Sequence, residues 1–67
     1  MKKEKLKYFL YSNVILEDVE SHVLEGWFIP YGRGYALVPN NDIWKIYLIK
    51  ASQIKSLTHK TNGVTMK

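Results

Sequence analysis

Short apolar runs separated by turn signals constrain the fold of this chain more than any other feature. Five runs follow one another: VILEDV, HVLEGWFIP, YALV, IWKIYLIK and SQIKSL. Runs rich in branched and aromatic residues, bounded by glycine, proline, asparagine and aspartate, are typical of β-strands. Several short strands in so small a chain predict a mostly β fold, namely a strongly bent, five-stranded antiparallel barrel.

The size of the chain limits how such a barrel can be stabilised. With 67 residues and no cysteine, it forms one domain at most and has neither disulfides nor thiolate-held zinc. A domain of this length buries only about 60% of the surface that its unfolded chain exposes. His22 and His59 lie far apart without a neighbouring ligand pattern, so we expect no metal and no other cofactor. Oligomerisation is the remaining support, and 46% hydrophobic residues favour a homo-oligomer.

Residues 1–13 form the basic start of a domain that we expect to span residues 1–58. Apolar residues at i, i+3 and i+4 from Leu6 fit a short amphipathic helix that ends at Asn13, whereas alternation from the same Leu6 fits a strand. The helix is slightly favoured because it places the lysines on the outer face. Residues 59–67 have little to pack against, and we expect a flexible tail.

Three residues set expectations for the strands. Gly26 interrupts the second run, which predicts a bulge or a sharp bend that helps the sheet to curl. Pro30 has no N–H to donate and is expected to end the ladder. A turn over residues 17–21 joins the first two runs, and Ile54 is the expected inward residue of the last run.

The run IWKIYLIK is expected to be the strongest strand. It has apolar residues on both faces, so both faces should be covered, one by the core and the other by a partner or the N-terminal segment. Trp27 and Trp44 are expected to pack in the core or in a subunit interface.

The charges are segregated along the chain. Four lysines crowd the first seven residues, four acids occupy residues 17–25 without a lysine or arginine, and no acid follows Lys45. The net charge of +4 favours anionic partners, nucleic acid foremost, although lysines that only solvate the surface would give the same total. Acidic and basic edges could also meet between neighbouring subunits. Without a long apolar run or a signal-peptide pattern, we expect a cytoplasmic protein with no membrane partner.

The stretch GWFIPYGRGYALVP holds the best candidate surface. Arg33, the one arginine of the chain, lies between two glycines and beside Tyr31 and Tyr35. Glycines allow a close backbone approach, tyrosines stack on bases, and a guanidinium binds phosphate. The alternative is that the glycines only serve a tight turn. The candidate RNA-binding residues are Tyr31, Arg33, Tyr35, Lys50, Lys3 and Lys5.

No enzyme is expected. Glu17, Asp18 and Glu20 lie in one exposed turn, whereas hydrolysis needs two carboxylates flanking a pocket or a metal cluster with a closed ligand geometry. This acidic turn therefore provides no candidate catalytic residue.

Pattern alone does not separate SH3-like, OB-like and Sm-like barrels, but one stretch is more specific. VILEDVESHVLEGWFIPYGRGYALV resembles the Sm-like family, which includes the bacterial RNA chaperone Hfq, with Gly26 at its bend glycine and Tyr31 at its aromatic position. IYLIKASQIKSL looks like the closing pair of short strands, and the resemblance covers roughly residues 5–58. Gly32 stands where the family has a turn acid, and Ala36 where it has a base-contacting asparagine.

The resemblance implies an N-terminal helix before five bent strands, and a hexameric or heptameric ring built by pairing edge strands of neighbouring subunits. It also implies RNA binding, with Lys50 close to the family's second RNA-binding motif. Our hypothesis is a non-catalytic protein that binds single-stranded RNA as a homo-oligomer. The alternative is an SH3-like module that binds a partner protein through its aromatic loop, and a barrel that binds duplex DNA is a third possibility.

Overall fold

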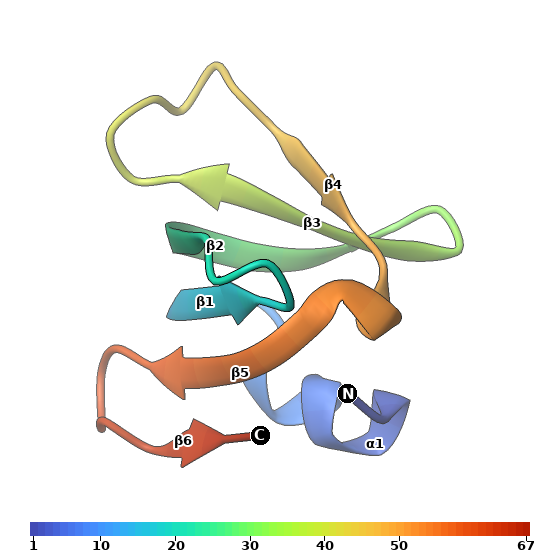
Figure 1. The fold of residues 1–67 in the computed structure, drawn as a ribbon. Helices are drawn as coiled ribbons and strands as arrows, with labels where there is room; N and C mark the ends of the chain where they lie inside the picture. Colours follow the sequence, from blue (N-terminus) through green and yellow to red (C-terminus); the bar gives the residue numbers. More distant parts are fainter.

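Six antiparallel strands form one sheet in the order β4-β3-β2-β1-β5-β6 (Figure 1). The computed structural model describes all 67 residues. The strands are β1 Ser12–Asp18, β2 Val23–Tyr31, β3 Gly34–Pro39, β4 Tyr47–Ile49, β5 Ile54–His59 and β6 Thr65–Met66. The helices are α1 Lys3–Leu6 and the 3-10 helices η1 Lys7–Phe9 and η2 Ala51–Gln53. The mostly β, antiparallel fold and the short N-terminal helix are confirmed. The sheet has six strands, however, and it is not closed, because β4 and β6 do not pair.

The N-terminal helix packs on the concave face of the sheet. Leu6 and Phe9 are fully buried, while the lysines of this segment are exposed, as the apolar spacing predicts. The helical segment ends at Phe9 rather than at Asn13, because the chain turns at Tyr11, whose φ is +61°. The core cluster consists of Leu6, Phe9, Val14, Leu16, Phe28, Leu37, Ile49, Ile54 and Leu57. Each such side chain contributes about 1.5–3 kcal/mol on burial.

Gly26 has a different role from the predicted bulge. The register continues through it, with Val14 and Pro39 as its partners in β1 and β3. A Cβ atom at this position would lie 2.7 Å from Pro39 Cα and closer still to the Val38 carbonyl oxygen. The glycine therefore allows β3 to approach β2 closely, and the one irregular pairing of β1 lies elsewhere, at Glu17/Asp18 against β5.

Pro30 does not end the ladder. It lies inside β2 and is paired with Tyr35 of β3, and the strand continues to Tyr31. β1 pairs with β2 only as far as Phe28. Because no strand lies beside Pro30 on the β1 side, its missing N–H removes no ladder bond, as at a sheet edge.

The run IWKIYLIK is mostly loop. Only its residues 47–49 form a strand, and Trp44, in the preceding turn, is 92% exposed. Asp42 explains the difference, because its Oδ1 accepts the Trp44 N–H at 3.1 Å and its carbonyl oxygen accepts the Lys45 N–H at 3.1 Å. Such aspartate-centred turns compete with strand pairing. Neither tryptophan packs in the core, since Trp27 is also half exposed, and their expected place in a subunit interface stays a prediction.

The C-terminal segment folds back on the sheet. Ile54 is 3% exposed and points inward, as predicted. Residues 59–67, for which a flexible tail was expected, form a turn and then β6, which pairs Met66 with Leu57. The turn is closed by hydrogen bonds between His59 and Val64 and between Gly63 and His59, both 2.7 Å long. This hairpin covers part of the outer edge of β5.

Candidate nucleic-acid interface

Two neighbouring hollows lie where the β2–β3 turn meets the β4–β5 connection. The first, of about 360 Å³, is here called the cationic hollow and is lined by Lys3, Arg33, Gly34, Tyr35, Lys50, Ala51 and Ser52. The second, of about 330 Å³, is called the tyrosine hollow and is lined by Tyr31, Gly34, Tyr35, Leu48, Ile49, Lys50 and Gln53. Five of the six candidate residues thus line the hollows, and Lys5 does not.

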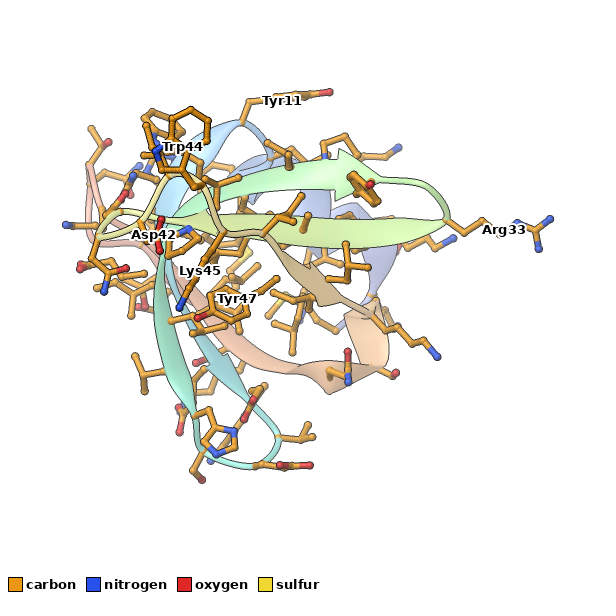
Figure 2. All side chains as sticks on the ribbon, turned by 90° about the horizontal axis from the view of Figure 1, so that it is seen from above. Tyr11, Arg33, Asp42, Trp44, Lys45 and Tyr47 are labelled. Carbon is orange, nitrogen blue, oxygen red and sulfur yellow. The ribbon has the colours of Figure 1, made fainter.

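The β2–β3 turn presents Arg33 to solvent. Tyr31 and Gly34 close the hairpin, and Gly32 occupies the first central position with φ +57°, as a type II′ turn requires. Gly34 meets a separate need, because a Cβ atom there would lie 3.0 Å from the Ile49 carbonyl oxygen. Gly32 therefore serves the turn and Gly34 the close approach of β4, and the turn projects the Arg33 side chain away from the sheet (Figure 2).

Lys50 is held at the start of η2. Its N–H donates to Gln53 Oε1 at 2.9 Å, and its carbonyl oxygen accepts the Gln53 N–H at 2.9 Å. The Met1 nitrogen donates to the Ala51 carbonyl oxygen at 2.9 Å. This long-range bond fixes the N-terminal segment beside the connection, and Lys3 therefore lines the cationic hollow.

The two tyrosines differ in how they are held. The Tyr35 ring stacks on Phe28 of the core, with ring centroids 5.2 Å apart and planes 14° from parallel. Tyr31 stands at the end of β2 and is 53% exposed. The hollow therefore has one ring that is backed by the core and one that is free to adjust to a ligand.

The cations of the cationic hollow have no acidic partner. Lys3, Arg33 and Lys50 take part in none of the ion pairs, and no acid lines either hollow. Four of the six acids are paired elsewhere, for example Glu25 with Lys60 at 2.9 Å. Lys5 is also turned away, because its Nζ donates to the Lys67 carbonyl oxygen at 3.2 Å. Positive charge is thus concentrated at this end of the sheet.

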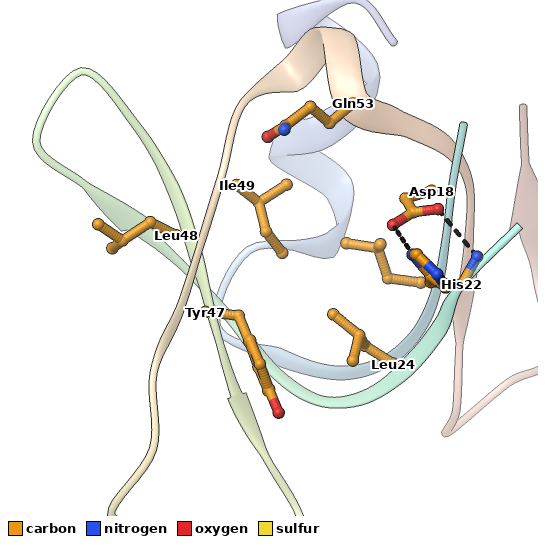
Figure 3. A pocket seen from close by; sticks show the side chains of 8 residues that line it. Asp18, His22, Leu24, Tyr47, Leu48, Ile49 and Gln53 are labelled. Carbon is orange, nitrogen blue, oxygen red and sulfur yellow. Dashed lines mark hydrogen bonds and ion pairs between the residues drawn. The ribbon is translucent and has the colours of Figure 1, made fainter. Parts of the chain in front are cut away.

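The acidic turn forms a structural motif beside an apolar groove (Figure 3), which shares Leu48, Ile49 and Gln53 with the tyrosine hollow. Asp18 Oδ1 accepts the backbone N–H groups of Glu20 at 2.8 Å and His22 at 2.9 Å, and Asp18 Oδ2 lies 3.3 Å from His22 Nδ1. The His22 N–H lowers the pKa of Asp18 most, and the Glu20 N–H adds to the effect. The groove, of about 290 Å³, is lined by Leu16, Asp18, His22, Leu24, Tyr47, Leu48, Ile49 and Gln53.

The interface also contains residues that were not singled out in the sequence. Ser52 and Gln53 line the hollows because η2 carries them there. A usable signal existed for Gln53, which follows Lys50 by three residues, the spacing at which a side chain returns to cap the start of a helix.

Across the whole chain, no three histidine, aspartate or glutamate side chains lie close enough together to hold a metal ion. None of the helices has the length and apolar character needed to cross a bilayer. No family model, no curated protein and no solved structure matches this chain. The functional conclusion therefore rests on the geometry and charge of the two hollows.

Proposed function

We propose that this protein binds single-stranded RNA, without catalysis, across the cationic and tyrosine hollows. The observation that carries the proposal is the meeting of three cations without acidic partners and two accessible tyrosines at one end of the sheet. These residues come from three segments that are far apart in the sequence. Neighbouring backbone phosphates would contact Lys3, Arg33 and Lys50, one phosphate each, and an attached base would enter the tyrosine hollow.

The tyrosines favour a single strand over a duplex. A base must leave its stack before it can lie on an aromatic ring, and only single-stranded segments offer such bases at little cost. Each base that stacks on an aromatic side chain contributes about 1–3 kcal/mol. Tyr35 cannot move away from a base because Phe28 supports its other face.

Salt dependence tests this proposal directly. We would measure the anisotropy of a labelled RNA of about twelve nucleotides between about 50 and 200 mM salt. Three phosphate contacts predict a slope of about −2 in log K against log salt, and Arg33→Ala should reduce its magnitude by about 0.7. Lys55→Ala is the matched control, because Lys55 lies outside both hollows and 3.8 Å from Glu17. Binding that ignores both salt and Arg33→Ala would contradict the proposal.

We also propose that the chain is a homo-oligomer of Sm-like architecture. A helix followed by the five strands β1 to β5 supports this view, with β6 as an addition. β4 is an unpaired edge of the sheet, and paired edges between subunits would satisfy its free backbone groups. Light scattering on a sizing column tests the oligomer, since a mass of six or seven subunits is expected for a ring and a monomer would contradict it.

One observation favours a protein-binding module as the second candidate. Ile43, Trp44 and Leu48 are all well exposed on or next to the β3–β4 loop, and tryptophan is enriched at the centre of protein interfaces. If the protein binds no RNA at low salt, this loop becomes the surface to test against partner proteins.

A further inference from the structure

The turn between β5 and β6 contains the one asparagine of the chain that is followed by glycine, Asn62 before Gly63. Asparagine is among the residues of proteins that are chemically labile on heating. Its side-chain carbon Cγ can form a five-membered ring with the backbone nitrogen of the next residue. Glycine has no Cβ atom, so it hinders the approach of these two atoms least. The pair is therefore the place in this chain where a spontaneous modification is most favoured by the sequence.

The folded turn binds every polar group that such a reaction needs. The Gly63 N–H donates to the His59 carbonyl oxygen at 2.7 Å. Asn62 Oδ1 accepts the Val64 N–H at 3.0 Å, and Asn62 Nδ2 donates to the Tyr8 hydroxyl oxygen at 2.9 Å. The Gly63 nitrogen therefore keeps its proton, and the Asn62 amide cannot rotate towards it, until the turn opens.

Tyr8 holds this turn from outside the hairpin. Its hydroxyl group binds Asn62, and its ring lies 5.6 Å from the His59 ring, centroid to centroid. Both contacts join η1 to the far end of the chain. The hairpin otherwise depends on the two-residue strand β6, and such short, exposed elements open locally at a lower free energy than the core.

We propose that Asn62 is a modification site, at which the side-chain amide is lost by reaction with the Gly63 nitrogen when the hairpin opens. The hydrogen bonds to Tyr8, His59 and Val64 keep this reaction slow in the folded chain. The site is independent of the proposed RNA binding, because Asn62 lines neither hollow.

The reaction consumes water and releases ammonia. The Gly63 nitrogen gives its proton to hydroxide and bonds to Asn62 Cγ, the bond between Cγ and Nδ2 breaks, and Nδ2 leaves as ammonia. Water then opens the cyclic imide at one of its two carbonyl carbons. Opening at Cγ gives an aspartate, whereas opening at the main-chain carbonyl carbon gives an isoaspartyl linkage. No oxidant or reductant takes part.

The isoaspartyl product should open the hairpin. Its main chain runs through Cγ, which adds one methylene group between His59 and Val64. The His59 N–H donates to the Val64 carbonyl oxygen at 2.7 Å in the unmodified turn, and the longer chain no longer fits this closure. The variant Asn62→Asp is the matched comparison, because it has the same charge as the product but a main chain of normal length.

The experiment follows loss of the Asn62 amide in the full chain at mildly alkaline pH by peptide mass spectrometry, with fragmentation that distinguishes aspartate from isoaspartate. We expect the folded chain to react about tenfold or more slowly than the chain in guanidinium chloride, because the folded chain must first open locally. Tyr8→Phe keeps the ring and removes the acceptor of Nδ2, so it should raise the rate in the folded chain about two- to tenfold and leave the rate in denaturant unchanged. Tyr11→Phe, the same change at a side chain that is 70% exposed, should alter neither rate.

Each result supports or overturns a stated part of the inference. Equal rates in the folded and the denatured chain would overturn the protection by the turn. Faster loss of the amide at Asn13, Asn40 or Asn41 than at Asn62 in denaturant would overturn the site itself. If Tyr8→Phe is folded by circular dichroism and reacts no faster than the unchanged chain, Tyr8 does not hold the turn closed. If it is not folded, the comparison of the unchanged chain with and without denaturant remains decisive.

Hydrogen exchange tests the effect on the hairpin. The His59 N–H should exchange about tenfold or more faster in the isoaspartyl product than in Asn62→Asp, since local opening governs its exchange. Equal exchange in the two would show that the added methylene group leaves the hairpin closed, against the inference.

Discussion

Phe28 supports Tyr35: their rings stack with centroids 5.2 Å apart, so a buried core residue holds a residue of the candidate interface in place. Phe28 itself is fully buried. Stability and binding are thereby linked through one aromatic pair.

The first prediction concerns this pair. Tyr35→Phe keeps the ring and should leave both the free energy of unfolding and the RNA affinity nearly unchanged. Tyr35→Ala should lower the free energy of unfolding by about 1–2 kcal/mol, since the stacked pair and buried area are lost, and weaken RNA binding by about fivefold or more. Urea unfolding and anisotropy measure the two effects. Equal RNA affinity of the two variants would exclude stacking on Tyr35.

The second prediction compares two glycines. Gly26→Ala should lower the free energy of unfolding by about 3 kcal/mol or more, because its Cβ would overlap backbone atoms of Val38 and Pro39 that cannot move separately. Gly32→Ala meets no atom within 4 Å but has a φ of +57°, so only about 1–2 kcal/mol of backbone strain is expected. Thermal unfolding of both variants provides the comparison, and similar losses would contradict the close approach of β2 and β3.

The third prediction concerns pH. The pKa of Asp18 is lowered below 3.8, first by the His22 N–H and also by the Glu20 N–H. A carboxyl group with a lower pKa in the folded state stabilises that state above its unfolded pKa, and this contribution is lost as pH falls through the folded value. Asp18→Asn does not titrate. The Tm of the unchanged chain should therefore fall towards, or below, that of the variant as pH decreases from about 5 to about 2.5.

A matched control is available for the pH experiment in the same turn. The Glu20 side chain accepts no backbone hydrogen bond and is well exposed. Glu20→Gln should reproduce the pH dependence of the unchanged chain. If Glu20→Gln removes the acid-induced loss and Asp18→Asn does not, the assignment to Asp18 is incorrect.

The fourth prediction concerns the exposed indole. Trp44 is 92% exposed, so Trp44→Ala should change the free energy of unfolding of the single subunit by no more than about 0.5 kcal/mol. If the proposed oligomer buries this side chain, the same variant should weaken self-association by about tenfold or more. Val23→Ala, at a side chain that is 63% exposed, serves as the control. A native mass that is unchanged in Trp44→Ala would place Trp44 outside the subunit interface.

The sequence predicts features that depend on neighbouring residues better than those that depend on distant ones. The spacing of Leu6 and Phe9 is sufficient for the N-terminal helix, since both side chains fall on one helical face. Gly26 is required because the backbone of β3, a dozen positions further along the chain, lies against it. The spacing of apolar residues around Gly26 does not indicate this contact. Trp44 was misplaced because it lies in a turn, in which Asp42 accepts the Trp44 N–H with its side chain and the Lys45 N–H with its carbonyl oxygen.

The same difference between contacts of neighbouring residues and contacts of distant residues applies to the candidate interface. Tyr31, Arg33 and Tyr35 are close in sequence, and their turn chemistry is readable from the glycines between them. Their meeting with Lys50 and Lys3 depends on the sheet order and on the contact of Met1 with Ala51, which no local pattern encodes.

The hairpin that ends in β6 pairs with the edge of β5, so a strand from another molecule would have to displace β6 in order to pair there. The outer side of β5 is already occupied at Leu57 and Thr58 by the chain's own Met66 and Thr65. A segment tethered by a short loop has an effective concentration in the millimolar range, so a strand from another molecule at micromolar concentration would need a much stronger affinity to displace it. β4 has no such internal competitor. The β4 edge is therefore available for pairing with another molecule, whereas the β5 edge becomes available only if β6 is displaced.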